Sequence, residues 1–202
     1  MLPMALLAVF ALCAWQVAAH GPLRTVDERL GRAIAGSPLP SPAAEFFADL
    51  GNTAVALPVL GVALACAAWR TRAAVRRWWP GPLAAALAMA VVPALVVPLK
   101  ALIDRPGPPG PLAGETGFFP SGHAATAAVA YGAAAVLLLP LLRGRLRGWL
   151  IGAVVLLNLA VGVGLVRRAY HWPLDVVGSW CLCGCLLWAV LRVREQSGRH
   201  PT

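Results

Sequence analysis

The chain consists of long apolar stretches separated by short polar connections. Six stretches are long and apolar enough to cross a bilayer, for which a helix needs about 20 mostly apolar residues. They are residues 2–19, 53–69, 82–99, 123–142, 149–166 and 176–191. None alternates between apolar and polar positions as the strands of a membrane barrel do. The pattern predicts an all-α protein, an integral membrane bundle of six transmembrane helices in one domain over residues 1–202, with core motifs at 100–175 and a cytoplasmic tail at 192–202.

Composition agrees with a membrane protein, since 59% of the residues are hydrophobic and only 12% are charged. The net charge of +9 is distributed unevenly among the connections. Those at 70–81 and 143–148, with the tail, carry ten basic residues and one acid, whereas the others carry seven of each. The positive-inside rule therefore places both termini in the cytoplasm and loops 20–52, 100–122 and 167–175 outside. The basic excess indicates topology and not nucleic-acid binding, for which the sequence has no motif.

The first span has two interpretations. Val17-Ala18-Ala19 resembles the small-residue site at which a signal peptide is cleaved. No Lys or Arg precedes the apolar stretch, which favours an uncleaved span. Either interpretation leaves the topology of the later spans unchanged.

The five cysteines all lie within apolar spans. Cys181, Cys183 and Cys185 alternate at every second position, so they do not converge on one face of a helix. Their spacing is not that of a zinc site. We predict that they are small buried residues and that the protein binds no metal through them.

Loop 20–52 is rich in Pro and Ser, which mark turns. Residues 42–50 within it suit a short helix at the membrane surface, with Phe46 and Phe47 entering the interface. The loop is otherwise a structured connection, and a role in substrate binding stays open.

The remaining titratable residues gather in two connections that the topology places on one membrane face. In HWPLD, His171 and Asp175 are four residues apart and share one face of a helix, whose first turn suits Pro173. A carboxylate beside an imidazole fixes its tautomer and leaves the second ring nitrogen free as a nucleophile. The alternative is a His-Asp pair that only caps the last span.

In PSGH, Ser121 suits the N-cap of the fourth span and Gly122 permits close backbone approach. A helix start offers free N–H groups to a phosphate, and His123 can protonate a leaving oxygen. The alternative is an ordinary Ser cap beside an interfacial His.

Four cations accompany these residues: Lys100, Arg105, Arg167 and Arg168. Arg grips phosphate with two bonds and Lys acts as a point charge, although each can also anchor a helix end at the headgroups. Together with two histidines and an aspartate they indicate a phosphate-ester site. No acidic cluster offers ligands to Mg²⁺, so we predict chemistry without a metal.

In order along the chain, KALIDRP (100–106), PSGH (120–123) and RRAYHWPLD (167–175) resemble the three motifs of the type 2 phosphatidic acid phosphatase superfamily. These membrane lipid phosphate phosphatases are related to vanadium haloperoxidases. The resemblance implies that His171 is a nucleophile that forms a phosphohistidine, that Asp175 orients it and that His123 is the general acid. The implied phosphate-binding residues are Lys100, Arg105, Ser121, Gly122 and Arg167.

The arginines depart from the family pattern. Gly107 stands where the first motif usually has its Arg, and Leu165 stands where the third has its own. The nearest arginines are Arg105, and Arg167 or Arg168. If these do not reach the phosphate, the site lacks contacts that commonly contribute on the order of 10²–10³ each in rate.

The sequence thus predicts a metal-independent lipid phosphate phosphatase, a phosphoric monoester hydrolase or a lipid pyrophosphatase, that needs no cofactor. The candidate substrates are polyprenyl phosphates or diphosphates, phosphatidic acid and phosphatidylglycerol phosphate. The predicted partners are this substrate and membrane lipids, with no nucleic acid and no obligate protein partner. Short loops suit a bacterial cytoplasmic membrane, with the site at its outer face. Two alternatives stay open: an inactive relative that binds lipid phosphate, and a phospholipid transporter or flippase.

Overall fold

The structure, a computed structural model, describes residues 1–73, 78–110 and 112–198. Its elements are α1 (Leu2–Ala18), α2 (Pro22–Ala35), α3 (Ser41–Asp49), α4 (Thr53–Thr71), α5 (Pro80–Ile103), α6 (Gly122–Leu138), the short 3-10 helix η1 (Leu139–Leu141), α7 (Arg145–Arg167) and α8 (Pro173–Gly198). Within these ranges there is no strand, and the predicted all-α class is confirmed. Three residues of the predicted charge asymmetry, Arg76, Arg77 and Arg199, lie outside the described residues.

The apolar helices form the membrane part of the protein. In the described chain, α4, α5, α6 with η1, α7 and α8 are each long and apolar enough to cross a membrane. α1 meets that criterion only together with α2, and the two are bent by 86°. The six predicted spans correspond to α1 and α4 to α8, with α5, α7 and α8 clearly longer than predicted. The prediction of an integral membrane bundle is confirmed.

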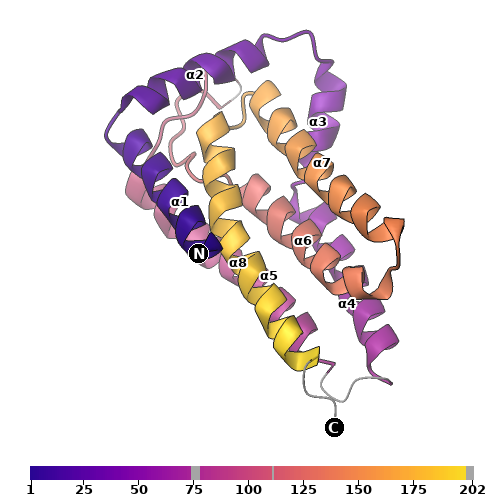
Figure 1. Cartoon of the computed structure of the whole chain (residues 1–202). Coiled ribbons are helices and arrows are strands. Elements are labelled where there is room, and N and C mark those ends of the chain that lie inside the picture. Colours follow the sequence, from indigo (N-terminus) through magenta and orange to yellow (C-terminus); the bar gives the residue numbers. More distant parts are fainter. Residues whose placement is uncertain (74–77, 111, 199–202) are drawn as a thin grey trace.

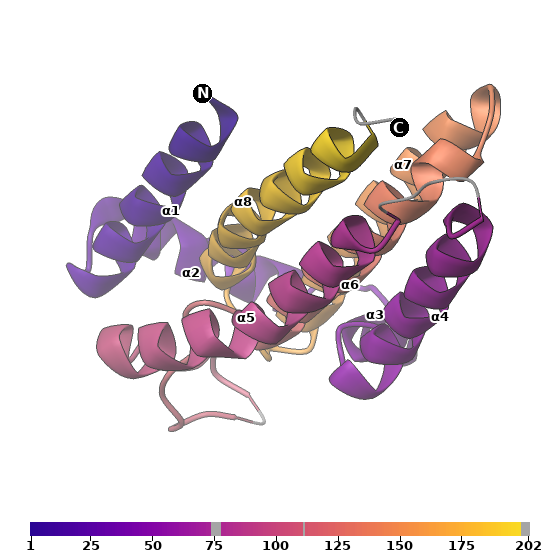
Figure 2. The ribbon, with the colours of Figure 1, turned by 90° about the horizontal axis from the view of Figure 1, so that it is seen from below.

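Helix α6 lies at the centre of the bundle. It contacts α4, α5, α7 and α8, and 72% of its apolar window is buried, against 22–39% for the other four spans. α1 contacts α8, and α3 contacts α7. Figure 2 shows α1 and α4 at opposite edges of the bundle. A central helix that begins at PSGH therefore holds this motif against its neighbours.

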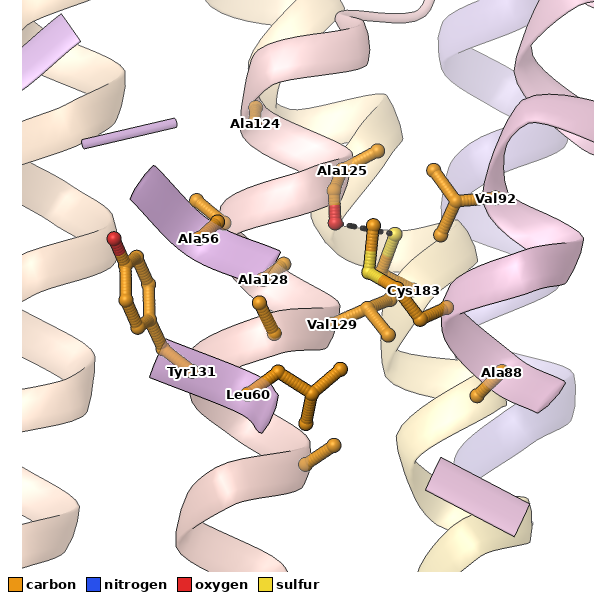
Figure 3. Packing of buried hydrophobic residues seen from close by; sticks show 14 of the residues in the cluster. Ala56, Leu60, Ala88, Val92, Ala124, Ala125, Ala128, Val129, Tyr131 and Cys183 are labelled. Carbon is orange, nitrogen blue, oxygen red and sulfur yellow. Dashed lines mark hydrogen bonds between the residues drawn. The ribbon is translucent and has the colours of Figure 1, made fainter. Parts of the chain in front are cut away.

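Small side chains let the neighbouring helices approach α6 closely. Figure 3 shows this contact region, with Ala124, Ala125, Ala128 and Val129 of α6, Ala56 and Leu60 of α4, and Ala88 and Val92 of α5. Cys183 of α8 points its Sγ at the Ala125 carbonyl oxygen, 3.5 Å away. Cys13, Cys181 and Cys183 are buried as predicted, whereas Cys66 and Cys185 are half-buried.

Helix α3 matches the short helix predicted at 42–50. It lies directly on α7, where a Cβ added at Gly164 would stand 2.6 Å from the Ala44 carbonyl oxygen. Phe46 is exposed, whereas Phe47 is half-buried. α3 is therefore part of the bundle, with one aromatic side chain left outward.

Helix α2 was not predicted. It crosses the end of the bundle where loop 104–121 lies (Figure 1). Leu23, Val26 and Leu30 form an exposed apolar stripe, while Asp27 and Gly31 are buried. Such a two-faced helix is typical of a membrane interface. Its buried face is turned toward the residues described next.

Candidate active site

Three polar segments meet at the end of the bundle that α2 crosses: loop 104–121, the first turn of α6 and the turn between α7 and α8. The Ser121 N–H donates to the Asp175 carbonyl oxygen at 3.0 Å. The Ser179 hydroxyl donates to the Ser121 carbonyl oxygen at 2.8 Å. The structure thus joins the PSGH and HWPLD segments through their backbones.

The HWPLD segment pairs His171 with Asp175. Asp175 Oδ2 accepts the Trp172 N–H at 2.9 Å and lies 3.3 Å from His171 Nδ1. Asp175 is fully buried and His171 is 6% exposed, with its ring edge-on to the Phe118 ring. The carboxylate therefore caps the start of α8 and also faces the imidazole, and these contacts fit either interpretation of the His-Asp pair. With Nδ1 held in this way, Nε2 is the nitrogen left to react.

The PSGH segment begins α6. Ser121 is its N-cap, and its Oγ accepts the Ala124 N–H at 3.2 Å. Ser121 is fully buried, whereas His123 is exposed and lines a groove together with Gly122. The N–H groups of a first helical turn have no acceptor within the helix and carry positive potential, which suits an anion.

Lys100 stands near the end of α5 and lines the same groove. Its Nζ donates to the Gly117 carbonyl oxygen at 2.6 Å and lies 6.0 Å from the centroid of the Phe118 ring. The His171 ring lies against the same Phe118 ring, with centroids 5.6 Å apart. Phe118 thus lies beside both Lys100 and His171, and His123 lines the groove together with Lys100.

Arg105 is turned away from the groove. Its Nη1 donates to Asp175 Oδ1 at 2.6 Å, and its Nη2 donates to Asp27. The guanidinium carbon lies 5.4 Å from the centre of the Trp172 ring, and the side chain has no exposed surface. The structure therefore places Arg105 behind Asp175, and not at the phosphate position expected from the sequence.

Arg167 and Arg168 are also bound elsewhere. Arg167 donates to the Leu39 carbonyl oxygen at 2.9 Å and to the Ala35 carbonyl oxygen at 2.7 Å, which ties the end of α2 to α7. Arg168 pairs with Glu45 of α3. The structure does not bring the Arg167 guanidinium to the two histidines.

The two positions at which the resemblance expects arginine have no room for one. A Cβ added at Gly107 would stand 2.5 Å from Phe118 Cζ, so the aromatic ring fills that space. Leu165 has no exposed surface, and its carbonyl oxygen accepts the Tyr170 N–H at 2.9 Å. The departures from the motif are thus built into the packing around His171.

The groove beside His123 and Lys100 has a volume of about 900 Å³ and lies between α4, α5 and α6. Asn52, Thr53, Lys100 and His123 line its polar end. Its walls beyond that end are apolar and include Leu57, Leu60, Leu64, Met89, Val92 and Val96. A cavity of this size holds a ligand of several hundred daltons. Its division into polar and apolar parts suits an amphiphile.

The charge available to an anion here comes from side chains and backbone N–H groups. Within the described part of the chain, no group of three or more His, Cys, Asp and Glu side chains is arranged to hold a metal ion. Lys100 and the first turn of α6 are the positive elements beside the histidines.

Sequence reasoning missed Asp27, which contacts both Arg105 and the start of α8. Its Oδ1 accepts the Leu174 N–H at 2.7 Å. The amphipathic pattern of residues 22–35 could have predicted helix α2, but it does not single out Asp27, which lies four positions from Leu23 and three from Leu30 at the edge of the apolar stripe. Its partner Arg105 is 78 positions away, and no local pattern reports such a pairing.

Comparison with known families shows which family the chain belongs to. The model of the PAP2 superfamily matches residues 81–199. The chain belongs to the PAP2 superfamily. The matched range includes α5 to α8, and with them Lys100 and the PSGH and HWPLD segments. Membership in the PAP2 superfamily supports a phosphatase activity.

The PAP2 fold extends over the whole chain. A crystal structure of a transmembrane PAP2 type phosphatidylglycerolphosphate phosphatase from Bacillus subtilis matches with a TM-score of 0.84. The identity is 24%, and the match covers 99% of each chain. At this identity the similarity shows the fold, including α1 to α4, which precede the family match. None of the curated proteins compared with the chain matches it.

Proposed function

We propose that the protein is a metal-independent lipid phosphate phosphatase that acts through a phosphohistidine on His171. The observation that carries the proposal is the placement of His123 and Lys100 at the polar end of an apolar groove. The buried His171–Asp175 pair lies beside that end, because the Phe118 ring next to Lys100 also lies against the His171 ring. Membership in the PAP2 superfamily supports the same reading.

The proposed reaction has two steps. Nε2 of His171 attacks the phosphorus, the bond from phosphorus to the lipid oxygen breaks, and His123 gives that oxygen a proton. Water then attacks the phosphohistidine, passes a proton to His123 and releases inorganic phosphate. Asp175 holds the Nδ1–H of His171 and stabilises the positive charge on the ring. Lys100 and the Gly122 N–H bind the phosphate oxygens, and Ser121 acts as the cap that fixes this turn.

A lipid substrate is favoured over a soluble phosphate ester. The groove is apolar along most of its length, so it suits an acyl or prenyl chain whose headgroup stands at Lys100 and His123. The candidates are polyprenyl phosphates or diphosphates, phosphatidic acid and phosphatidylglycerol phosphate. The last is the substrate named for the Bacillus subtilis protein of the same fold, which makes it the first lipid to assay.

The orientation in the membrane follows from the charge pattern. The ten basic residues against one acid in the connections at 70–81 and 143–148 and in the tail support a cytoplasmic location for both termini. The site then faces the outer side of a membrane, which we infer to be a bacterial cytoplasmic membrane.

A second function, an inactive protein that binds lipid phosphate, is favoured by one observation. Arg105 and Arg167 are both bound to other groups of the protein, which leaves Lys100 as the cation beside the histidines in the part of the chain described here. Turnover separates this function from the enzyme. A transporter is disfavoured because His123, His171, Asp175 and Lys100 lie at one end of the bundle and not near its middle.

The test is phosphate release by the detergent-purified protein in EDTA, across a panel of these lipids. We expect release by the wild type and none by His171→Ala. His20→Asn is the matched control, because His20 lies at the connection of α1 and α2, and Asn tolerates its positive φ of 55°. Equal release by His171→Ala, or activity that EDTA abolishes and Mg²⁺ restores, would contradict the proposal.

A further inference from the structure

Helix α2 supports the HWPLD segment from behind through two contacts. Asp27 Oδ1 accepts the Leu174 N–H at 2.7 Å. One turn further along α2, a Cβ added at Gly31 would stand 2.7 Å from the Trp172 ring, so the helix backbone lies against that ring. The residues on either side of Pro173 are thus fixed by α2.

Asp27 also shares the Arg105 guanidinium with Asp175. Arg105 donates Nη2 to Asp27 and Nη1 to Asp175, and the three side chains are at most 2% exposed. Two carboxylates therefore divide one buried cation between them. The Arg105 Nε has no hydrogen-bond partner among the described residues, so the guanidinium is held through its two terminal nitrogens.

This sharing controls which oxygen of Asp175 is available to His171. An arginine and a carboxylate tend to form two parallel hydrogen bonds that occupy both oxygens. Here one arm of Arg105 is directed to Asp27, and Arg105 contacts Oδ1 of Asp175 alone. Oδ2 remains for the Trp172 N–H and for His171 Nδ1.

We propose that Asp27 is a positioning residue of the site: it holds Arg105 so that Oδ2 of Asp175 stays directed at His171. The inference rests on the proposed function, because it assigns Asp27 to the orientation of the nucleophile. It acts through Arg105 and Asp175 and does not touch the substrate.

The first test is Asp27→Asn, which keeps the shape of the side chain and an oxygen for the Leu174 N–H but removes the charge that holds Arg105. We expect kcat to fall by about tenfold to a hundredfold, the size of effect found for residues that orient the ligands of metal sites, with KM close to the wild-type value. Glu28→Gln is the matched control, because among the described residues Glu28 pairs with Arg24 and Arg32, which belong to the same helix. An unchanged kcat in Asp27→Asn would overturn the inference.

A second comparison covers the case in which Asp27→Asn does not fold, since breaking a buried ion pair on one side is costly. Arg105→Gln is compared with the double variant Asp27→Asn/Arg105→Gln, which leaves no buried cation unpaired. If Asp27 acts through Arg105, the double variant has the kcat of Arg105→Gln. A further loss of tenfold or more in the double variant would show that Asp27 acts by another route.

A spectroscopic measurement separates this inference from the proposed function, because it needs no turnover. The Nδ1–H proton of a histidine bonded to a carboxylate gives a downfield resonance, which is assigned by its absence in His171→Ala. We expect the resonance to shift in Asp27→Asn and not in Glu28→Gln. An unshifted resonance would overturn the positioning role even in an active enzyme. A shifted one in a protein that releases no phosphate would sustain the positioning role and contradict only the phosphatase.

Discussion

Arg105 and Asp175 lie together inside the protein, with Nη1 of the guanidinium 2.6 Å from Oδ1 of the carboxylate and neither side chain exposed. This pair joins the end of the first motif to the start of α8, across 70 positions of sequence. The second oxygen of the same carboxylate faces His171. The geometry of the proposed nucleophile therefore depends on a buried ion pair and not on the local helix alone.

Asp175→Asn should disable the reaction while leaving substrate binding nearly intact. An amide cannot hold the Nδ1–H of His171 as a carboxylate does, and it favours the wrong tautomer. We expect kcat to fall on the order of 10³–10⁴-fold with KM close to the wild-type value. The measurement is steady-state phosphate release. The control is Asp104→Asn at an exposed position of positive φ that Asn tolerates; wild-type kcat in Asp175→Asn would contradict the assignment.

Lys100→Met should reduce kcat/KM on the order of 10²–10³-fold, because it removes the ammonium that we place against the phosphate oxygens. Arg168→Met removes a cation at the same end of the bundle. Arg168 pairs with Glu45 at the surface, and such pairs contribute about 0–1 kcal/mol. We therefore expect that control to retain the kcat/KM of the wild type. Equal losses in both variants would show that only the general positive potential matters.

Arg167→Gln should affect stability and not catalysis. The guanidinium holds the carbonyl oxygens of Ala35 and Leu39, and its loss should lower the free energy of unfolding by about 1–3 kcal/mol. Thermal unfolding in detergent and the kinetics of phosphate release are measured on the same sample. A large fall in kcat/KM with unchanged stability would restore the role expected from the sequence, in which Arg167 binds phosphate.

Gly61→Phe should select against long-chain substrates. Gly61 lines the groove, and a Cβ added there meets no atom within 4 Å, so a larger side chain can occupy the space that we assign to the lipid tail. We expect kcat/KM to fall for long-chain lipid phosphates and to change little for short-chain ones. Gly152→Phe on α7, where an added Cβ is equally free, is the control. An equal loss of kcat/KM for long and short chains would show that the groove does not hold the lipid tail.

Patterns of neighbouring residues were sufficient to predict the helices and contacts that depend on local sequence. Long apolar runs predicted α1 and α4 to α8, and the Ser121 cap set the start of α6. The four-residue spacing correctly paired His171 with Asp175, although His171 precedes α8 and the contact forms in the turn that Asp175 caps, not on a shared helix face. Residues 42–50 were correctly expected to form a helix, found as α3.

What the sequence could not supply is the pairing of distant polar groups. Arg105 was expected at the phosphate because of its place in the motif, but a buried guanidinium is directed by the nearest buried carboxylates. One of these, Asp27, belongs to α2, which was read as part of a connection. The lack of room for a side chain at Gly107 could not be predicted either, since only the packed structure shows that the Phe118 ring fills this space.

The measurement that tests the central claim most directly is trapping of the intermediate. The protein is mixed with a lipid phosphate labelled at phosphorus, quenched in alkali within one turnover and digested. A phosphohistidine survives alkali and is lost in acid, so the account predicts an alkali-stable label on the peptide that contains His171, absent from His171→Ala and retained in His20→Asn. A label that alkali removes, a label on another peptide, or turnover without any labelled protein would contradict it.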